Sequence, residues 1–281
     1  MTPLDPTHLV PPHLLHLFPG GLAAAGKLPA TKPATLAIVG TRDPVPELET
    51  FARQLAAAAV AQGFVVVSGG AVGIDTAAHE GALEAGGATW IVSPVPLGEV
   101  TPLENTPLFE RTLASGGAVI TRQLKSAILK SSIYFRRNEL LVSLADAVVV
   151  VQARHRSGAL NAAKHARDLG VPLWAVPAPP WHASACAGSV QLIEHGHARA
   201  LWRVDDLLGT PAPRVAPPSV PAQLPFEAVA VLSALGINPT HLDEIIEQSA
   251  LAPQDATVRL LTLAGLGVVR EGPPGWFRRL R

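Results

Sequence analysis

The chain has 281 residues, of which 48% are hydrophobic, 16% are charged and one is a cysteine. This composition excludes a disordered, highly charged chain, a disulfide framework and a cluster of thiolate metal ligands, and it favours a reducing compartment. The formal net charge is zero, so the overall charge offers no argument for binding nucleic acid.

Residues 1–33 predict a short N-terminal segment, interrupted by prolines, that packs on the domain after it. The segment has no basic region followed by an apolar run, so we expect no secretory signal. No stretch of about 18 apolar residues in the chain is free of glycine, proline and charge, so we expect no membrane span. These observations predict a cytoplasmic protein with no membrane partner.

Residues 34–208 alternate between apolar β-rich runs and helical stretches. Strands are predicted at 35–39, 64–68, 88–92, 117–121, 147–152 and 172–176, and helices at 47–62, 74–86, 107–115, 135–145 and 158–169. Continuous apolar runs are typical of strands that helices cover on both faces. The pattern therefore predicts an α/β fold, a doubly wound and mostly parallel sheet, with its ligand at the carboxyl ends of the strands.

Two turns in the first half of this domain favour an anion. Gly40-Thr41-Arg42 follows the first strand, where free N–H groups, a hydroxyl and a guanidinium suit a phosphate; the alternative is an ordinary turn with a surface arginine. The stretch from Ser68 to Asp75 includes Gly69 and Gly73 and opens a helix, which predicts an anion site without a Walker motif. The simpler role of Asp75 is to cap free N–H groups.

A later turn and the local charge point the same way. Ser157-Gly158 opens a helix, and the Ser157 hydroxyl suits an N-cap and a phosphate ligand equally. Residues 111–167 hold ten Lys or Arg and two acids, a net charge of +8, against −6 for residues 1–110 and −2 for 168–281. Most of these cations follow the fourth and fifth strands: Arg122, Lys125, Lys130, Arg136, Arg137, Arg154, Arg156 and Lys164.

Tyr134 and Phe135 lie among those cations. Cations that follow phosphates, beside an aromatic ring that stacks on a base, suit single-stranded nucleic acid; the alternative is a solvated basic face. No pairing of a nucleophile with a base and no metal-ligand spacing is evident, so we predict no catalytic residue and no metal site. His79 is expected to be a packed or surface histidine.

The C-terminal part is predicted to form a second domain. Residues 209–225 include six prolines and predict a semi-rigid linker. Within 226–281, helices are expected at 226–235, 240–248 and 254–265, followed by two short strands around a Pro-Pro-Gly turn. Three helices and a hairpin are the layout of a winged helix.

Several motifs together resemble the DNA-processing protein A (DprA/Smf) family. They are IVGTR (38–42), VVSGGAVGIDTAAHEGAL (66–83), YFRRNELLVSLADAVVVVQA (134–153), SGAL (157–160), AVPAPP (175–180) and GSVQLIEHGHA (188–198). The resemblance covers about residues 35–200, and residues 226–281 resemble the winged-helix domain of many members. It implies an extended Rossmann-like domain that binds single-stranded DNA in natural transformation, protects incoming DNA and helps load the RecA recombinase.

The resemblance also implies a homodimer, no enzymatic activity and no cofactor. Family positions for DNA contacts fall on Arg42, Gly69, Gly73, Arg137, Asn138, Ser157 and Gly158. With the residues chosen for charge and position, the predicted DNA-binding set is Gly40, Thr41, Arg42, Gly69, Gly73, Arg122, Lys125, Lys130, Tyr134, Arg136, Arg137, Asn138, Ser157 and Gly158.

The chain departs from the family pattern at four positions, Val72, Glu139, Gln152 and Ala162. Val72 and Glu139 stand where the family has arginine, so two positive charges are absent from the expected pocket and one position has become negative. Each lost phosphate contact lowers the affinity for DNA and its salt dependence.

Two other functions compete with this interpretation. The sheet also resembles that of lysine-decarboxylase-like nucleoside monophosphate hydrolases, which would make the chain a nucleotide sensor or hydrolase, but their PGGxGTxxE motif is not found. A transcription factor would read DNA with helix 254–265, whose main polar side chains are Gln254, Thr257 and Arg259. We expect instead a protein-interaction or auxiliary DNA role for 226–281, so deleting 210–281 should preserve most single-strand affinity.

Overall fold

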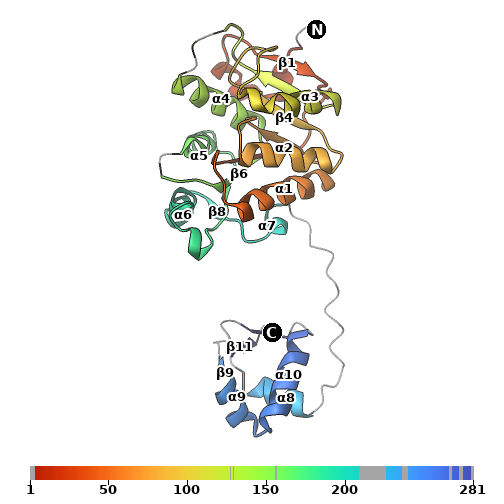
Figure 1. The fold of residues 1–281 in the computed structure, drawn as a ribbon, viewed down its shortest axis with the longest axis vertical. Coiled ribbons are helices and arrows are strands. Elements are labelled where there is room, and N and C mark those ends of the chain that lie inside the picture. Colours follow the sequence, from red (N-terminus) through yellow and green to blue (C-terminus); the bar gives the residue numbers. More distant parts are fainter. Residues whose placement is uncertain are drawn as a thin grey trace. The chain divides into compact units, whose positions relative to one another are not determined.

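The computed structural model describes residues 4–126, 128, 130–155, 157–208, 226–235, 240–265, 268–271 and 275–279. The chain divides into two compact units, Met1–Gly209 and Thr210–Arg281, and each is considered by itself (Figure 1). The predicted linker at 209–225 lies outside the described residues.

A single sheet organises the first unit. Its strands are β1 (Ala23–Gly26), β2 (Thr35–Gly40), β3 (Val65–Ser68), β4 (Thr89–Ser93), β5 (Ala118–Thr121), β6 (Ala147–Gln152), β7 (Leu173–Ala175) and β8 (Arg199–Ala200). They lie in the order β1-β5-β4-β3-β2-β6-β7-β8, and β1 runs antiparallel to β5 while the other neighbours are parallel. The six predicted strands and the doubly wound, Rossmann-like sheet are confirmed, and the strand order reverses between β2 and β6.

Helices cover both faces of this sheet. They are α1 (Pro46–Ala61), α2 (Ile74–Glu84), α3 (Thr106–Ala114), α4 (Ser131–Leu144), α5 (Gly158–Asp168), α6 (Ala187–Glu194) and α7 (Val204–Leu208), with 3-10 turns at Thr7–Leu9, Pro12–Leu17, Leu103–Asn105 and Pro180–His182. Figure 1 shows α1, α2 and α3 on one side and α4 and α5 on the other. The prediction of a helix over 135–145 is wrong at its start, because α4 begins at Ser131.

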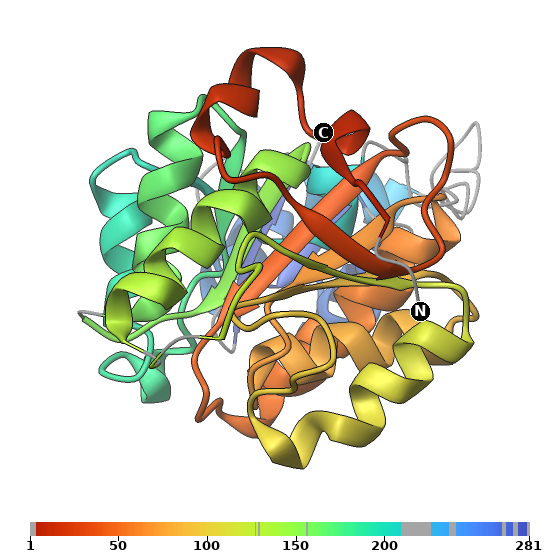
Figure 2. The same cartoon turned by 90° about the horizontal axis from the view of Figure 1, so that it is seen from above.

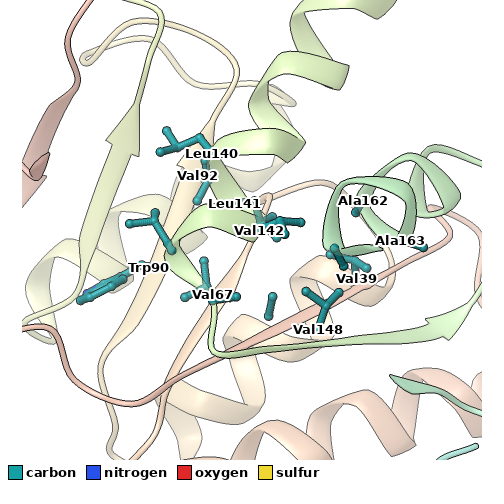
Figure 3. Close-up of a cluster of buried hydrophobic side chains, with 14 of the residues drawn as sticks. Val39, Val67, Trp90, Val92, Leu140, Leu141, Val142, Val148, Ala162 and Ala163 are labelled. Carbon is teal, nitrogen blue, oxygen red and sulfur yellow. The ribbon is translucent and has the colours of Figure 1, made fainter. Parts of the chain in front are cut away.

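Alternate residues of the central strands enter two different cores. Leu36 and Ile38 of β2 pack with α1 and α2, whereas Ala37 and Val39 pack with α4 and α5. Figure 3 shows the second of these cores, where Val39 and Val148 of the sheet meet helical side chains. Because both faces are buried, the strand sequences are continuous apolar runs rather than alternations.

The N-terminal segment contributes more than a preface. Leu9, Leu14 and Phe18 are buried in the core on the α4 and α5 side. Strand β1 then pairs with β5 and forms one edge of the sheet. Figure 2 shows this segment in red, along one side of the first unit. Its Ala-rich sequence, AAAG, carries little strand signal, which explains why the strand was not predicted.

The second unit has the winged-helix layout. Its helices are α8 (Phe226–Ser233), α9 (Leu242–Ser249) and α10 (Pro253–Gly265), and its sheet has the order β10 (Val269–Glu271), β11 (Trp276–Arg279), β9 (Thr240–His241). The helix predicted over 240–248 is wrong at its start. Thr240 and His241 pair with β11 as a short strand, and α9 begins two residues later, at Leu242. Among the described residues of both units, no helix combines the length and apolar character needed to cross a membrane.

Candidate nucleic-acid interface

A cavity of about 630 Å³ opens where the strand order reverses, at the carboxyl ends of β2 and β6. In open α/β sheets this crevice is the usual place for a ligand. The cavity is lined by Val39, Gly40, Thr41, Arg42, Ala71, Asp75, Lys130, Ser131, Tyr134, Phe135, Arg137, Asn138, Leu141, Arg154, His155, Ser157, Gly158, Ala159 and Ala162.

Cationic side chains reach this cavity from three elements. Arg42 follows β2 and is exposed, and its guanidinium carbon lies 5.3 Å from the ring centre of Tyr134 in the first turn of α4. Lys130 precedes α4, and Arg154 follows β6 and forms an ion pair of 2.8 Å with the exposed Asp43. Arg42 thus presents an exposed charge and Tyr134 an aromatic ring at the same wall of the cavity, the combination that suits a phosphate next to a base.

The start of α5 supplies hydrogen-bonding groups to the same cavity. The Ser157 hydroxyl oxygen accepts a hydrogen bond from the N–H of Ala159, 3.1 Å away, so Ser157 caps the helix. A hydroxyl that accepts such a bond still carries a proton that it can donate. Capping and contact with an anion are therefore compatible at Ser157, and the exposed Gly158 beside it leaves backbone accessible.

Two buried charges hold the Gly-rich loop from inside. Arg137 of α4 donates hydrogen bonds to the carbonyls of Gly69 and Val92, the latter at 2.9 Å. The Asp75 carboxylate accepts from the N–H of Ala71 at 3.4 Å, as its predicted capping role requires. Burial raises the pKa of Asp75, and the charge of Arg137 and the loop N–H groups oppose that rise. Burial also lowers the pKa of Arg137, which Asp75 opposes.

Two glycines of the predicted set, Gly69 and Gly73, are required by the packing of the protein itself. A Cβ on Gly69 would overlap the guanidinium of Arg137. Gly73 has a φ of +83°, and a Cβ there would come within 2.6 Å of the Thr41 carbonyl oxygen. The N–H of Ile74 donates to that carbonyl at 3.2 Å. Gly73 therefore lets the Gly-rich loop approach the Thr41-Arg42 turn closely, and Gly69 leaves room for the guanidinium of Arg137. Neither glycine lines the large cavity formed by the described residues.

Asn138 connects the two helices that flank the cavity. Its side-chain amide donates to Asn161 Oδ1 at 3.0 Å and to the Gly158 carbonyl at 3.3 Å. Its oxygen accepts from Arg137 Nε at 3.1 Å. The Arg137-Asn138 pair thus fixes α4 against both the Gly-rich loop and α5, so we assign it a positioning role in the site.

The predicted set is only partly brought together. Nine members line the cavity: Gly40, Thr41, Arg42, Lys130, Tyr134, Arg137, Asn138, Ser157 and Gly158. The other five described members, Gly69, Gly73, Arg122, Lys125 and Arg136, do not line it, although Gly69 lines a smaller cavity beside it. Arg156, noted among the cations, is outside the described residues.

Arg122 and Glu139 form a separate contact. Arg122 makes an ion pair of 2.5 Å with Glu139, donates to the Leu17 carbonyl at 3.0 Å, and lies over the Phe18 ring at 4.9 Å. Glu139 was expected to place a negative charge in the pocket, and this expectation is wrong, since its carboxylate is turned to Arg122. The position that departs from the family pattern therefore anchors the N-terminal segment to α4.

Some lining residues are not in the predicted DNA-binding set. Val72, identified from the sequence as a departure from the family pattern in the expected pocket, lines a smaller cavity of about 140 Å³, which shares Arg42, Tyr134 and Arg137 with the large one. His155 lines the large cavity and was not singled out, although its position directly after a predicted strand was a usable signal. No group of three or more His, Cys, Asp or Glu suited to a metal ion occurs within the described ranges.

Comparison with known proteins gives one consistent result. The family model of DNA recombination-mediator protein A matches residues 10–210, and that of the DprA winged helix domain matches residues 215–271. A DNA processing protein of Mycobacterium tuberculosis (strain H37Rv) is 35% identical over 256 residues, which are 88% of this chain and 65% of the relative. The chain thus spans slightly less than two thirds of that relative's length.

Solved structures agree with this result. DNA processing protein A from Helicobacter pylori, solved to describe its single-stranded DNA binding mode, has a TM-score of 0.63 at 26% identity and covers 74% of this chain and 94% of its own. DNA processing protein A from Streptococcus pneumoniae has a TM-score of 0.60 at 28% identity and covers 67% of this chain and 65% of its own.

Proposed function

Because the chain belongs to the DNA recombination-mediator protein A family, we propose that its first unit binds single-stranded DNA in the cavity between β2 and β6. The observation that carries this proposal is the convergence of Arg42, Lys130 and Arg154 with the ring of Tyr134 on one cavity. Cations bind the phosphates, and the ring offers a stacking surface for a base. The Helicobacter pylori relative, described for binding single-stranded DNA, supports the same ligand.

The polarity of the cavity supports an anionic ligand. Asp75 is its one acidic lining residue among those described, and it is buried against the Gly-rich loop and Arg137. The exposed charges are those of Arg42, Lys130 and Arg154. This arrangement also gives no support to a hydrolase, since the one carboxylate is already engaged within the protein.

The proposal includes the biological role implied by the family. The chain would act without catalysis, as a homodimer in the cytoplasm, protecting incoming single strands in natural transformation and helping RecA recombinase to load on them. Loading is tested by the rate at which RecA forms filaments on strands precoated with a single-strand binding protein, with and without this chain. An unchanged rate would contradict the RecA part of the proposal alone.

DNA binding is tested by fluorescence anisotropy of a labelled oligo-dT titrated with the chain at several salt concentrations, with duplex DNA as the comparison. We expect a preference for the single strand, with log K falling by about 0.7 per log unit of salt for each phosphate contacted. Replacing Arg42 with Ala should weaken binding and lower that slope by about 0.7. Arg111→Ala, on α3 outside the cavity, is the matched control. Absence of oligo-dT binding at low salt would overturn the proposal.

A further inference from the structure

The second unit carries a helix-turn-helix formed by α9 and α10. In DNA-binding proteins with this motif the first helix crosses the phosphate backbone and the second lies in the major groove. The outward surfaces of α9 and α10, which we call the helix-turn-helix face, are therefore where duplex DNA would be met. The side chains of this face decide what it can bind.

The outward side of α10 is apolar. Val258 and Leu261 are 55% and 60% exposed, and their spacing of three residues places them on one side of the helix. The opposite side of α10 enters the core of the unit through Leu260 and Leu263, and Ala256 on that side is also buried. The remaining exposed positions of the described helix are Pro253, Gln254, Asp255 and Thr262. Only Gln254 among these exposed residues is of a type that commonly reads bases, none is Arg, Lys or Asn, and Arg259 of the same helix is partly buried.

The same face is acidic where a phosphate would bind. Asp243 and Glu244 lie in the first turn of α9, and Asp255 lies in the first turn of α10. A helix N-terminus attracts anions through its free N–H groups and its dipole. A carboxylate side chain in the first turn already supplies the negative charge that these groups favour. Glu247 adds a further exposed carboxylate on α9. Phosphates approaching this face would therefore meet like charge.

An aromatic ring lies beside the acidic first turn. Trp276 of β11 is 41% exposed, and its ring lies 5.2 Å from that of His241, the residue that caps α9. Tryptophan is enriched among the residues that carry most of the binding energy in protein interfaces. The face thus combines apolar anchors with an acidic rim. Residues 240–265 hold four acids against one arginine, and the other four arginines of 226–281 all follow residue 265.

We propose that the helix-turn-helix face binds a basic amphipathic helix of a partner protein, and that duplex DNA is not its ligand. The apolar side of such a helix would cover Val258 and Leu261, and its lysines or arginines would face Asp243, Glu244 and Asp255. Helix-in-groove recognition uses this spacing of apolar anchors, and complementary charge sets orientation and association rate. The inference is independent of single-strand binding by the first unit.

The test uses the full chain and a fluorescein-labelled synthetic helix of leucine and lysine, with leucines on one side, read by anisotropy. We expect binding that falls at least about tenfold when Val258 and Leu261 are both replaced with Gln, the loss typical of interface anchors. Val229→Gln on α8, an apolar residue that is 47% exposed, should leave the affinity unchanged. Replacing Asp243, Glu244 and Asp255 with their amides should reduce the salt dependence of binding.

Two further measurements make the result decisive. The double variant should keep the wild-type circular dichroism and oligo-dT affinity, which shows that the chain remains folded. A peptide with glutamate in place of lysine should bind at least about tenfold more weakly than the basic one, because it meets like charge. The proposal is overturned if the double variant binds the basic peptide as tightly as wild type. It is equally overturned if wild type binds duplex DNA and the double variant loses that binding.

Discussion

Arg137 and Arg42 line the same cavity, but their surroundings give them different roles. Arg137 is buried and hydrogen-bonded to two carbonyls beside the buried Asp75, whereas Arg42 is exposed. Replacing Arg137 with Gln should lower the free energy of unfolding by about 3–5 kcal/mol, because it leaves a buried charge unpaired. Replacing Arg42 with Ala should change it by less than about 0.5 kcal/mol. Urea unfolding of both variants checks this, and similar losses would contradict the assignment.

His79 makes stability depend on pH. Its ring is fully buried, and Nδ1 donates to Thr89 Oγ1, 2.7 Å away, since the Thr89 hydroxyl itself donates to the Val66 carbonyl. Within the described structure Nε2 has no partner, and burial followed by the charge of Arg137 lowers the pKa of His79 from 6.5 to about 3. The unfolded chain therefore binds one more proton between these values, so this histidine makes the fold less stable as pH falls below 6.5.

The magnitude follows from linkage. His79 should contribute a loss of up to about 1.4 kcal/mol per pH unit between pH 6 and pH 4. The variant His79→Gln removes this contribution, so its urea midpoint should depend less steeply on pH than that of wild type, whatever its stability at pH 7. Parallel pH profiles for the two proteins would show that His79 does not titrate in this way.

The chemistry of single residues could be predicted only where it depends on neighbours in sequence. The Gly40-Thr41-Arg42 turn and the Ser157 cap were identified because each follows a strand or opens a helix. The contact of Arg137 with the Gly69 carbonyl joins residues 68 positions apart. The sequence predicted an anion site in the Gly-rich loop, but which loop groups already have internal partners depends on that long-range contact.

At the scale of elements, apolar patterning predicted the central parallel strands well. It failed for the two edge strands and for the start of α4, where the sequence signal is weak. Strand β1 consists of AAAG, and β8 has two residues, so neither carries a β-rich run. Helix α4 begins at Ser131 after Lys130, which makes no side-chain cap within the described contacts. Without a capping signal the start of the helix could not be located, and Tyr134 fell just before the predicted helix over 135–145 rather than in the first turn of α4.

The Arg122-Glu139 pair joins the N-terminal segment to α4, so its removal should loosen the attachment of that segment to the sheet domain. Replacing Glu139 with Arg, the residue of the family pattern, places two cations together and should lower the free energy of unfolding by about 2 kcal/mol. It should leave oligo-dT affinity nearly unchanged, because Glu139 does not line the cavity in the described structure. Limited proteolysis before β2 should become faster.

A surface pair provides the comparison for that variant. Lys164 and Asp168 form an exposed ion pair along α5, and replacing Lys164 with Ala should cost no more than about 0.5 kcal/mol. If Glu139→Arg costs as little, or if it strengthens oligo-dT binding several-fold, the anchoring role is wrong and Glu139 acts on the ligand instead.

At the scale of the whole molecule, the charges are distributed unevenly between regions with different expected ligands. Residues 111–167 have a net charge of +8, and the cavity that they help to line lies within the first unit. A chain ending at Gly209 should therefore bind oligo-dT within about threefold of the full chain, a difference of less than 1 kcal/mol. Anisotropy of the two chains at equal salt measures this. Loss of most affinity would mean that the second unit contributes directly to single-strand binding.

The ring above Arg42 belongs to the single tyrosine of the chain. Biosynthetic incorporation of fluorotyrosine would therefore place one fluorine nucleus in the molecule, at the wall of the cavity, and its NMR spectrum would contain one resonance to assign. Ring currents from a stacked base shift such a resonance, whereas a phosphate held by Arg42 alone acts on it mainly through charge. The occupancy of the cavity, and the manner in which it is filled, can thus be followed by one spectroscopic signal in the intact protein.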